Sequence, residues 1–487
     1  MSGVDTAWLR MDSASNRMMI IGIEVFESPV GAAPLRDLLR TRLLAHRRFR
    51  QRVEIDPAGA WWVEDGEPEL DRHLIEHRLP APGGDAELQA LVGELASQPL
   101  DPLRPLWQMH LVSNYHGTEA LVARIHHCIA DGIALVAVML SLTDASPAAA
   151  GRGDAAAAVG ADAAASRDGD DAERNPWAPY LRPITAKTVR AIDLSAAAWS
   201  QSLKLIARPE RLIDCAEVGS RVIRDAVEIA RMPDDSATSL KGRPGMQKRV
   251  AWADPLPLDE VKAVCRVLGA SVNDVLLSCV AGALRRYLAG RGEATADVEI
   301  RAMVPINLRP LERALELGNR FGLVPLTLPV GIANPFERLR ELRARMEALK
   351  GGYQAVLAFG LLGAVGYAPK PVQQAILDLM ARKATAVMTN VPGPQQPIRL
   401  AGTKLSRLMF WVPQSGAIGL GVSILSYDGA VQFGVIADAG LCPDPQALIA
   451  AFAPEFERLV LSLALTPRDY ALDPAADPED WEHRLFA

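Results

Sequence analysis

The stretch His126-His127-Cys128-Ile129-Ala130-Asp131-Gly132 contains the side chains whose types and spacing are best suited to chemistry. A neutral imidazole, with an ordinary pKa of about 6.5, can take a proton from a hydroxyl or a thiol. Asp131 can hold the local geometry, and Gly132 permits close approach of backbone or substrate. The pattern HHxxxDG therefore indicates general-base catalysis.

Two other interpretations of the histidine pair stay open. Adjacent histidines near the end of a strand can be core residues with satisfied hydrogen bonds. They can also be half of a metal site, but no cysteine pair or third histidine lies at ligand spacing nearby. Cys128 is isolated and is expected to pack as a small apolar residue. We therefore predict no metal.

The elements on either side of the motif must position it. The apolar run 121–125 predicts a buried strand, and the run 133–140 predicts a helix. Adjacent side chains of an extended segment point to opposite faces, so one histidine can face a cavity while the other faces packing.

Apolar periodicity and turn residues predict an α/β chain on both sides of the motif. In the N-terminal part we predict strands over 19–26, 107–112 and 120–125, helices over 34–46 and 88–95, and a turn at Asn114, His116 and Gly117. In the C-terminal part we predict helices over 259–268 and 273–288, a strand over 298–304, and a hairpin of 419–426 with 430–437. Asp428-Gly429 joins the hairpin and is typical of a type I′ turn.

Composition excludes several classes of protein. With 487 residues the chain can form two or three domains, and its net charge of −6 argues against a nucleic-acid binder. The five cysteines form no CxxC, so we expect a reducing compartment rather than a disulfide scaffold. Residues 1–10 contain no apolar signal core. The uncharged segment 351–369 has five glycines, which favours a buried or interfacial helix over a membrane span.

A segment rich in Ala, Asp and Gly divides the chain. Such a composition cannot bury enough apolar surface to order itself, so it predicts a disordered linker. We predict an N-terminal half over 1–143, the linker over 144–180, a helical bridging region over 181–240, and a C-terminal half over 241–487. The bridging region is interpreted as an ordinary helix pair, with docking to a membrane surface as the alternative.

Further motifs carry a resemblance to a known family. They are Asp5, Trp8, Met11, Asn16 and Met18 at the start, Pro99-Leu100-Asp101, Pro105-Leu106-Trp107, Ser271-Val272-Asn273-Asp274, and the blocks 304–309, 317–322 and 389–394. HHxxxDG is the signature of the CoA-dependent acyltransferase superfamily. The ordered set resembles the bacterial wax ester synthase/diacylglycerol acyltransferase family across almost the whole chain. Arg17 departs from it, because the family usually has proline there.

The resemblance implies two chloramphenicol-acetyltransferase-like α/β halves with the active site in a tunnel between them. It also implies O-acyl transfer from acyl-CoA to diacylglycerol or a long-chain alcohol, with acyl-CoA as a co-substrate and no cofactor. His127 would be the general base. His126 would support the loop, Asp131 would orient it, and Gly132 would leave room for substrate.

The resemblance implies further site residues, each of which could instead have a purely structural role. Asn273 is the candidate donor to the oxyanion, or a helix cap, and Asp274 complements the helix dipole. The remaining candidates for substrate binding are Pro105, Leu106, Trp107, Asn307, Arg309 and Asn319. Trp107 could instead be core, Arg309 could contact CoA phosphate or form a surface ion pair, and Asn307, Arg309 and Asn319 could shape the domain interface.

Because such substrates are insoluble, we expect a cytoplasmic protein attached peripherally to the inner membrane or to lipid droplets. Two alternatives stay open: transfer to another alcohol, amine or carrier-bound acceptor, and a catalytically silent lipid-droplet protein. The chain-length preference and the choice between wax ester and triacylglycerol depend on the channel, which the sequence does not specify.

Overall fold

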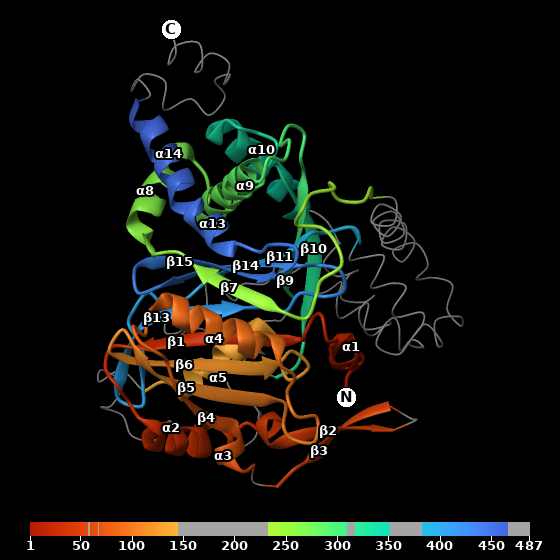
Figure 1. Ribbon diagram of the computed structural model, residues 1–487, viewed down its shortest axis with the longest axis vertical. Helices are drawn as coiled ribbons and strands as arrows, with labels where there is room; N and C mark the ends of the chain where they lie inside the picture. The colour runs from red at the N-terminus through yellow and green to blue at the C-terminus, as the bar shows by residue number, and fades with distance from the viewer. Residues whose placement is uncertain (57–58, 67, 145–231, 309–316, 351–381, 466–487) are drawn as a thin grey trace, which may run out of the picture.

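The structure is a computed structural model, and it describes residues 1–56, 59–66, 68–144, 232–308, 317–350 and 382–465 (Figure 1). Three predicted segments lie largely or wholly outside these residues: the linker apart from Asp144, most of the bridging region, and the uncharged segment 351–369.

The first sheet carries the histidine motif at the end of a central strand. Its order is β12-β13-β1-β6-β5-β4. The strands are β1 (Met19–Phe26), β4 (Leu74–Arg78), β5 (Trp107–Tyr115), β6 (Thr118–His126), β12 (Arg399–Leu400) and β13 (Thr403–Trp411). A separate hairpin of β2 (Gln51–Asp56) and β3 (Gly59–Glu64) extends beside it in Figure 1.

The second sheet is formed by the C-terminal part of the chain, in the order β10-β9-β11-β14-β15-β7, with β8 also on β15. Its strands are β7 (Lys248–Trp252), β8 (Leu256–Pro257), β9 (Ile300–Asn307), β10 (Phe321–Leu328), β11 (Ala386–Pro392), β14 (Leu420–Tyr427) and β15 (Ala430–Asp438). β11 runs parallel to both β9 and β14, and the other pairs are antiparallel.

Two strands from the C-terminal part, β12 and β13, belong to the N-terminal sheet. β13 pairs antiparallel with β1, from Ile21 opposite Trp411 to Phe26 opposite Leu405. The division of the chain at the linker therefore does not coincide with the division of the strands between the two sheets.

Helices cover both faces of the N-terminal sheet. The described helical segments of this half are α1 (Gly3–Met11), α2 (Ala32–Leu38) with a π turn (Leu39–Leu43), a 3-10 turn (Arg47–Arg50), α3 (Leu70–His73), α4 (Asp85–Ser97) and α5 (Gly132–Leu142). α5 packs on one face, against alternate residues such as Ile20, Ala123 and Ile125. α4 packs on the other face, where Leu88 and Val92 are fully buried.

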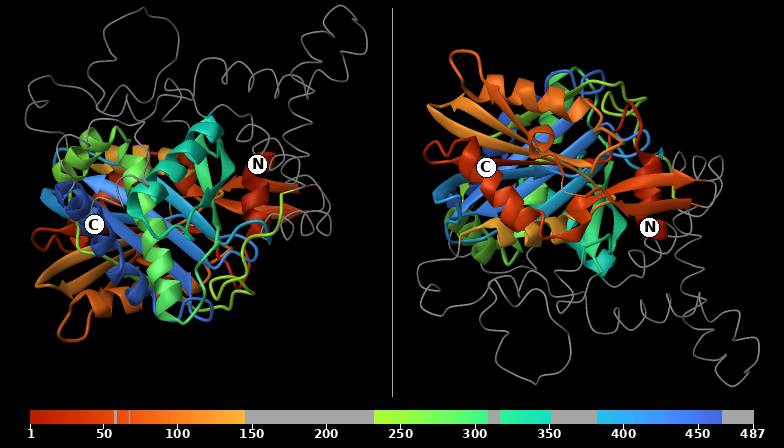
Figure 2. Two further views of the ribbon diagram at one scale, coloured as in Figure 1. Left: turned by 90° about the horizontal axis from the view of Figure 1, so that it is seen from above. Right: turned by 90° about the horizontal axis from the view of Figure 1, so that it is seen from below.

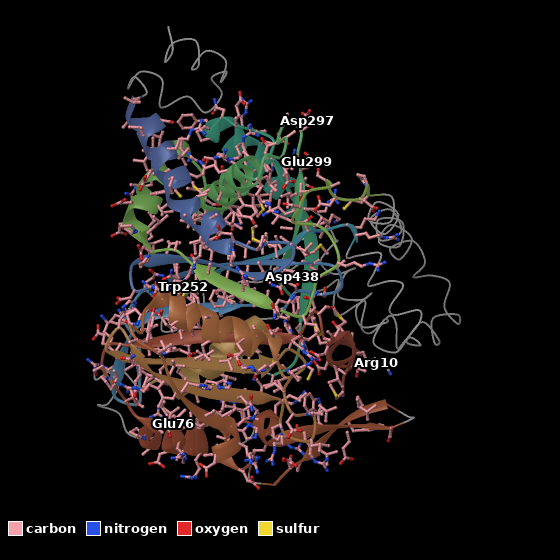
Figure 3. All side chains as sticks on the ribbon, viewed as in Figure 1. Arg10, Glu76, Trp252, Asp297, Glu299 and Asp438 are labelled. Atoms are coloured by element: carbon pink, nitrogen blue, oxygen red, sulfur yellow. The ribbon has the colours of Figure 1, made fainter. Side chains whose placement is uncertain are left out.

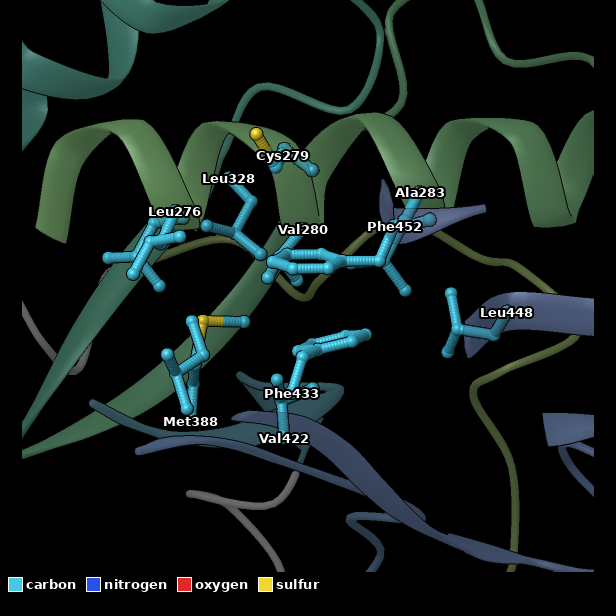
Figure 4. Packing of buried hydrophobic residues seen from close by; sticks show 14 of the residues in the cluster. Leu276, Cys279, Val280, Ala283, Leu328, Met388, Val422, Phe433, Leu448 and Phe452 are labelled. Atoms are coloured by element: carbon cyan, nitrogen blue, oxygen red, sulfur yellow. The ribbon is translucent and has the colours of Figure 1, made fainter. Parts of the chain in front are cut away.

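The C-terminal sheet is covered by α8 (Leu258–Leu268), α9 (Val272–Gly290), α10 (Pro335–Lys350), α13 (Pro445–Ala450) and α14 (Phe452–Leu465), which lie across its strands in the left view of Figure 2. α9 is the central helix, and its residues Leu276, Val280 and Ala283 face the sheet (Figure 4). Phe433 of β15 stacks on Phe452 with ring centroids 3.9 Å apart, which ties the sheet to α14.

A buried ion pair lies within the helices of this half. Glu455 of α14 accepts hydrogen bonds from Arg338 of α10 and Arg286 of α9, and the Arg338 and Glu455 side chains are each 1% exposed. The pair passes directly over Gly282 of α9, where a methyl group would overlap both the carboxylate and the guanidinium. Glycine at this position is therefore required by the close approach of the charges.

The two halves meet where α4 packs on β7. The indole of Trp252 donates to Asp85 at 3.1 Å, and Lys248 donates to Asn16 at 2.8 Å while facing Asp438 at 3.6 Å. Trp252 and Asp438 mark this junction in Figure 3. Asn16 also donates to the carbonyl of Gly416 at 2.7 Å, so the start of the chain is bound to the C-terminal half.

Most predicted elements are confirmed. β1, β5, β6, β9, α8, α9 and the β14–β15 hairpin occupy the predicted segments, and Asp428 and Gly429 have the positive φ of a type I′ turn, 46° and 75°. The helix predicted over 34–46 is wrong at its end, because it widens into the π turn and stops at Leu43. Several elements were not predicted from the sequence: α1, α3, β4, the β2–β3 hairpin, β7, β8, β10, β11, β12, β13, α10, α13 and α14.

Candidate active site

The motif lies at the junction of β6 and α5. The strand ends at His126, opposite Met19 of β1, and the amide of His127 donates to the carbonyl of Met18 at 2.7 Å. Asp131 caps α5 by accepting from the amide of Ala134 at 2.9 Å. Its second oxygen accepts from the amide of Arg320, also at 2.9 Å. Asp131 therefore fixes the helix start to a segment of the C-terminal half.

A chain of hydrogen bonds orients the His127 ring. Nδ1 of His127 lies 2.8 Å from Oδ1 of Asn319. The amide nitrogen of Asn319 donates to Asp5 and to the carbonyl of His127, each at 2.8 Å. Because Oδ1 of Asn319 can only accept, His127 must donate through Nδ1. This tautomer leaves the lone pair on Nε2 available as a base.

Aromatic rings hold the same imidazole in place. Trp8 of α1 stacks on His127 with ring centroids 4.1 Å apart and planes at 16°, and Phe321 lies 5.4 Å away. His127 is 3% exposed. Burial lowers its pKa below the ordinary value, and the opposing attraction of Asp131 does not outweigh the burial. The ring is thus neutral at physiological pH.

His126 does not share the hydrogen-bond partners of His127 and is packed inside the protein. Its Nδ1 accepts from the amide of Cys128 at 3.2 Å, and its Nε2 lies 3.9 Å from Asp12. Burial lowers the pKa of His126 to about 3. Across the described ranges no group of three or more His, Cys, Asp or Glu residues is placed to hold a metal ion.

Asn273 and Asp274 lie in the first turn of α9. Ser271 is the N-cap, and Asp274 completes a capping box by accepting from the amide of Ser271 at 3.0 Å. Asn273 is not the cap; its Oδ1 accepts from Asn390 of β11 at 2.8 Å. Asp274 thus has a local role at the helix end, and no hydrogen bond between described residues joins Asn273 to the histidines.

Trp107 belongs to the core that supports β6. Its ring is fully buried, stacks on His73 at 4.2 Å and donates to the carbonyl of Phe49 at 2.9 Å. Leu106 accepts from the amide of His126 at 2.9 Å, so this motif, with Pro105 also buried beside it, fixes the strand end.

The other predicted residues are placed differently. Asn307 ends β9, where its backbone pairs with Phe321 next to the site. Arg309 lies outside the described residues. Asn319 was predicted to bind substrate or to shape the domain interface. The structure places it between the halves and directly against His127.

An apolar cavity of about 110 Å³ lies between α5 and the face of the N-terminal sheet. It reaches Ile125 and Gly132, which flank the histidines in the sequence, and runs along α5 to Thr143. Residues of both halves line it, since β11 contributes Val391 and β13 contributes Leu408. Its size and lining suit part of a hydrocarbon chain.

Three residues around His127 had no assigned role in the sequence analysis. Asp5, Trp8 and Phe321 complete the hydrogen-bond chain and the ring stack. Asp5 and Trp8 carry the spacing of one helical turn in the opening motif, and Phe321 follows Asn319 by two residues. Their membership of the motif blocks was the only signal in the sequence that could have marked them. The contacts themselves could not be predicted, because His127 and Asp5 lie about 190 and 310 residues from Asn319.

Asn319 can be tested as a positioning residue. Asn319→Leu is expected to lower kcat/KM by about 10²-fold, because an unheld imidazole loses its productive orientation. Asn319→Asp should place a carboxylate on Nδ1 and move the acid limb of the kcat/KM profile to higher pH. An unaltered profile in the Asp variant, measured on folded protein, would contradict a direct contact with the base.

Two family models and several known proteins match this sequence. The family model described as the wax ester synthase/diacylglycerol acyltransferase catalytic domain matches residues 1–276, and the model of the WS/DGAT C-terminal domain matches residues 317–460. A probable diacylglycerol O-acyltransferase of Mycobacterium tuberculosis is 29% identical over 430 residues, covering 87% of this chain and 86% of that protein. A second one from the same organism is 27% identical, covering 92% and 95%.

Solved structures show the same fold. A wax ester synthase/diacylglycerol acyltransferase from Marinobacter aquaeolei VT8 matches with a TM-score of 0.63 at 22% identity, covering 94% of this chain and 97% of that one. The first condensation domain of the calcium-dependent antibiotic synthetase matches with a TM-score of 0.56 at 15% identity, covering 99% and 97%. These neighbours confirm the predicted two-part α/β fold. Because the catalytic-domain model alone covers more than half of the sequence, the chain belongs to the wax ester synthase/diacylglycerol acyltransferase family.

Proposed function

We propose that this protein transfers a long-chain fatty acyl group from acyl-CoA to the hydroxyl of a diacylglycerol or a long-chain alcohol, with His127 as the general base. The observation that carries this proposal is the His127 ring, held neutral with Nδ1 donating to Asn319. The apolar cavity is lined by Ile125 and Gly132, which flank the histidine motif in the sequence, and it suits part of the acyl chain. Family membership supports the reaction class.

In this mechanism Nε2 of His127 takes the proton of the acceptor hydroxyl as its oxygen attacks the thioester carbonyl. The carbon–sulfur bond then breaks, and the imidazolium returns the proton to the CoA thiolate. No acyl-enzyme is needed, because both substrates are held together. Asp5 supports the transient imidazolium through Asn319 without itself taking the proton.

The oxyanion of the tetrahedral intermediate needs a donor, and Asn273 or the N-terminus of α9 is the candidate for that role. Asn390 supports it, because this residue holds Oδ1 of Asn273 and leaves the amide nitrogen of Asn273 as a donor.

The test is release of CoA thiol from palmitoyl-CoA by the purified full chain, with hexadecanol or dipalmitoylglycerol as acceptor. Release that depends on an acceptor is the expected result, and the preferred acceptor names the product. Lipid binding without release from folded protein would overturn the proposal in favour of a silent lipid-binding protein.

The pH dependence of kcat/KM follows from the neutral His127. Because burial lowers its pKa, the base stays deprotonated through pH 6.5, and the acid limb should appear only at lower pH. With a histidine of ordinary pKa as the base, kcat/KM would already fall to half its maximum at about pH 6.5.

Circular dichroism at each pH is the necessary control for that profile. The depressed pKa of His126 means that the unfolded chain takes up protons first, so stability falls as pH drops below about 6.5. An acid limb at or above pH 6.5 in folded protein would contradict the proposed state of His127.

The variant Gly132→Ala tests whether Gly132 is needed to leave space for substrate rather than for packing of the protein. Apart from its chain neighbours and the backbone of its own helix, no atom of the described residues lies within 4 Å of the position that a Cβ on Gly132 would occupy, although Gly132 lines the cavity. We expect unchanged or slightly higher thermal stability, with kcat/KM for long-chain substrates lowered about 10-fold by the added methyl group. Gly290→Ala, an equally open position at the end of α9, should leave kcat/KM unchanged. Equal turnover in both variants would contradict a substrate beside Gly132.

Peripheral attachment to a bilayer or lipid droplet is part of the proposal. The hairpin β2–β3 presents Ile55 and Trp61 at 73% and 48% exposure, which suits shallow insertion between lipid headgroups. No described helix is by itself long and apolar enough to cross a bilayer; α8 and α9 meet that test only as a pair, with a 100° bend between them.

A further inference from the structure

Glu24 of β1 is a carboxyl group in an otherwise apolar place. It lines the cavity between α5 and the sheet, on the same strand face as Ile20 and Gly22. Its neighbours across the cavity are apolar side chains of α5, among them Leu135 and Met139. The residue is 6% exposed, so water does not solvate the carboxyl group freely.

The second oxygen of Glu24 has an unused hydrogen-bonding capacity. Oε2 is buried without a hydrogen-bond partner, and no charged side chain among the described residues contributes to the pKa shift of Glu24. Burial raises the pKa of Glu24 to about 8, so the neutral acid predominates at pH 7. A buried polar atom without a hydrogen-bond partner destabilises the folded protein, and a ligand that supplies the partner would remove that cost.

The position of Glu24 along β1 fixes where on a substrate it would act. Met19 pairs with His126 at the motif, and Glu24 pairs with Leu121 five residues further along the strand. At about 3.4 Å per residue, Glu24 is roughly 17 Å from the strand end that carries the motif. α5 runs away from the motif in the same direction, and the cavity follows it from Gly132 to Thr143.

We propose that Glu24 forms a polar subsite in the cavity and selects a long hydrocarbon chain that carries a hydroxyl group well away from its reacting end. A hydroxyl both donates and accepts, so it can pair with Oε2 whether that oxygen carries the proton or not. A carbonyl group can pair with only one of those forms. That the hydroxylated hydrocarbon belongs to a reacting substrate rests on the proposed function. Selective binding of such a hydrocarbon does not rest on it.

Binding without turnover tests the subsite. Dissociation constants of stearic acid and 12-hydroxystearic acid are measured on the full chain by displacement of a fluorescent fatty acid. Wild type is expected to bind the hydroxylated acid about five- to tenfold more tightly. Glu24→Leu should abolish this preference and bind stearic acid more tightly than wild type does. Glu24→Gln keeps a donor and an acceptor and should retain part of the preference.

Thr143→Val is the matched control. Thr143 lines the same cavity, but its hydroxyl already donates to the carbonyl of Leu140 at 2.7 Å, so its removal should not alter the preference. Equal binding of the two acids by wild type, or a preference that survives in Glu24→Leu, would overturn the proposal. The same measurement on His127→Ala should keep the preference, which separates failure of the subsite from failure of the catalytic assignment.

Discussion

His127→Ala is expected to lower kcat by about 10²–10⁴-fold, with a much smaller effect on binding of acyl-CoA. The variant removes the nitrogen that takes the acceptor proton but leaves the apolar cavity and its lining unchanged. Acceptor-dependent thiol release, measured at saturating palmitoyl-CoA, gives kcat directly. Uncatalysed thioester hydrolysis must be subtracted, because it sets the floor of the assay.

The chain offers a closely matched control for this variant. His73 is also a buried histidine, stacks on a tryptophan with centroids 4.2 Å apart, and hydrogen-bonds through Nδ1 at 2.7 Å to the carbonyl of Trp107. His73→Ala should therefore reproduce the packing loss of His127→Ala without its loss of turnover. A similar fall in kcat for both variants would show that packing, rather than a base, explains the effect.

Glu455→Leu is expected to lower the free energy of unfolding by about 3–5 kcal/mol, because it leaves the guanidinium of Arg338 buried without its carboxylate. Denaturation in urea, followed by circular dichroism, measures the change. The double variant Glu455→Leu/Arg338→Met removes both charges and should recover much of the loss.

Glu347→Leu is the control on the surface of α10. Glu347 pairs with Arg343 at 3.5 Å, but both side chains are largely exposed, so the free energy of unfolding should change by less than about 1 kcal/mol. If Glu455→Leu were no more destabilising than this variant, the buried pair would contribute little to the fold.

The elements around the motif could be predicted because local patterns specify them. The apolar runs on each side of His126 and His127 correctly predicted β6 and α5. The pair Asp428-Gly429 correctly predicted the hairpin turn. The capping residue Ser271 marked the start of α9. In each case the information lies within a few residues of the element itself.

Contacts between distant segments could not be predicted in the same way. The sequence analysis placed Asn319 at a domain interface, but nothing in its neighbourhood indicates that its amide accepts from His127. The strand β13 itself was not predicted, and its pairing with β1 could not be, because a strand pattern does not identify the partner strand. Glu24 looked like any polar residue in a strand, and only the cavity shows that it is unusual.

The shared sheet also determines when the active site can be assembled during synthesis. β1, β5 and β6 leave the ribosome early, but the strand that covers the other edge of β1 is made only near the end of the chain. Until then β1 presents open amide and carbonyl groups beside an apolar face, a template for pairing with other chains. We therefore expect completion of this sheet to be a late step of folding, with the nascent N-terminal half protected from other chains until β13 is made.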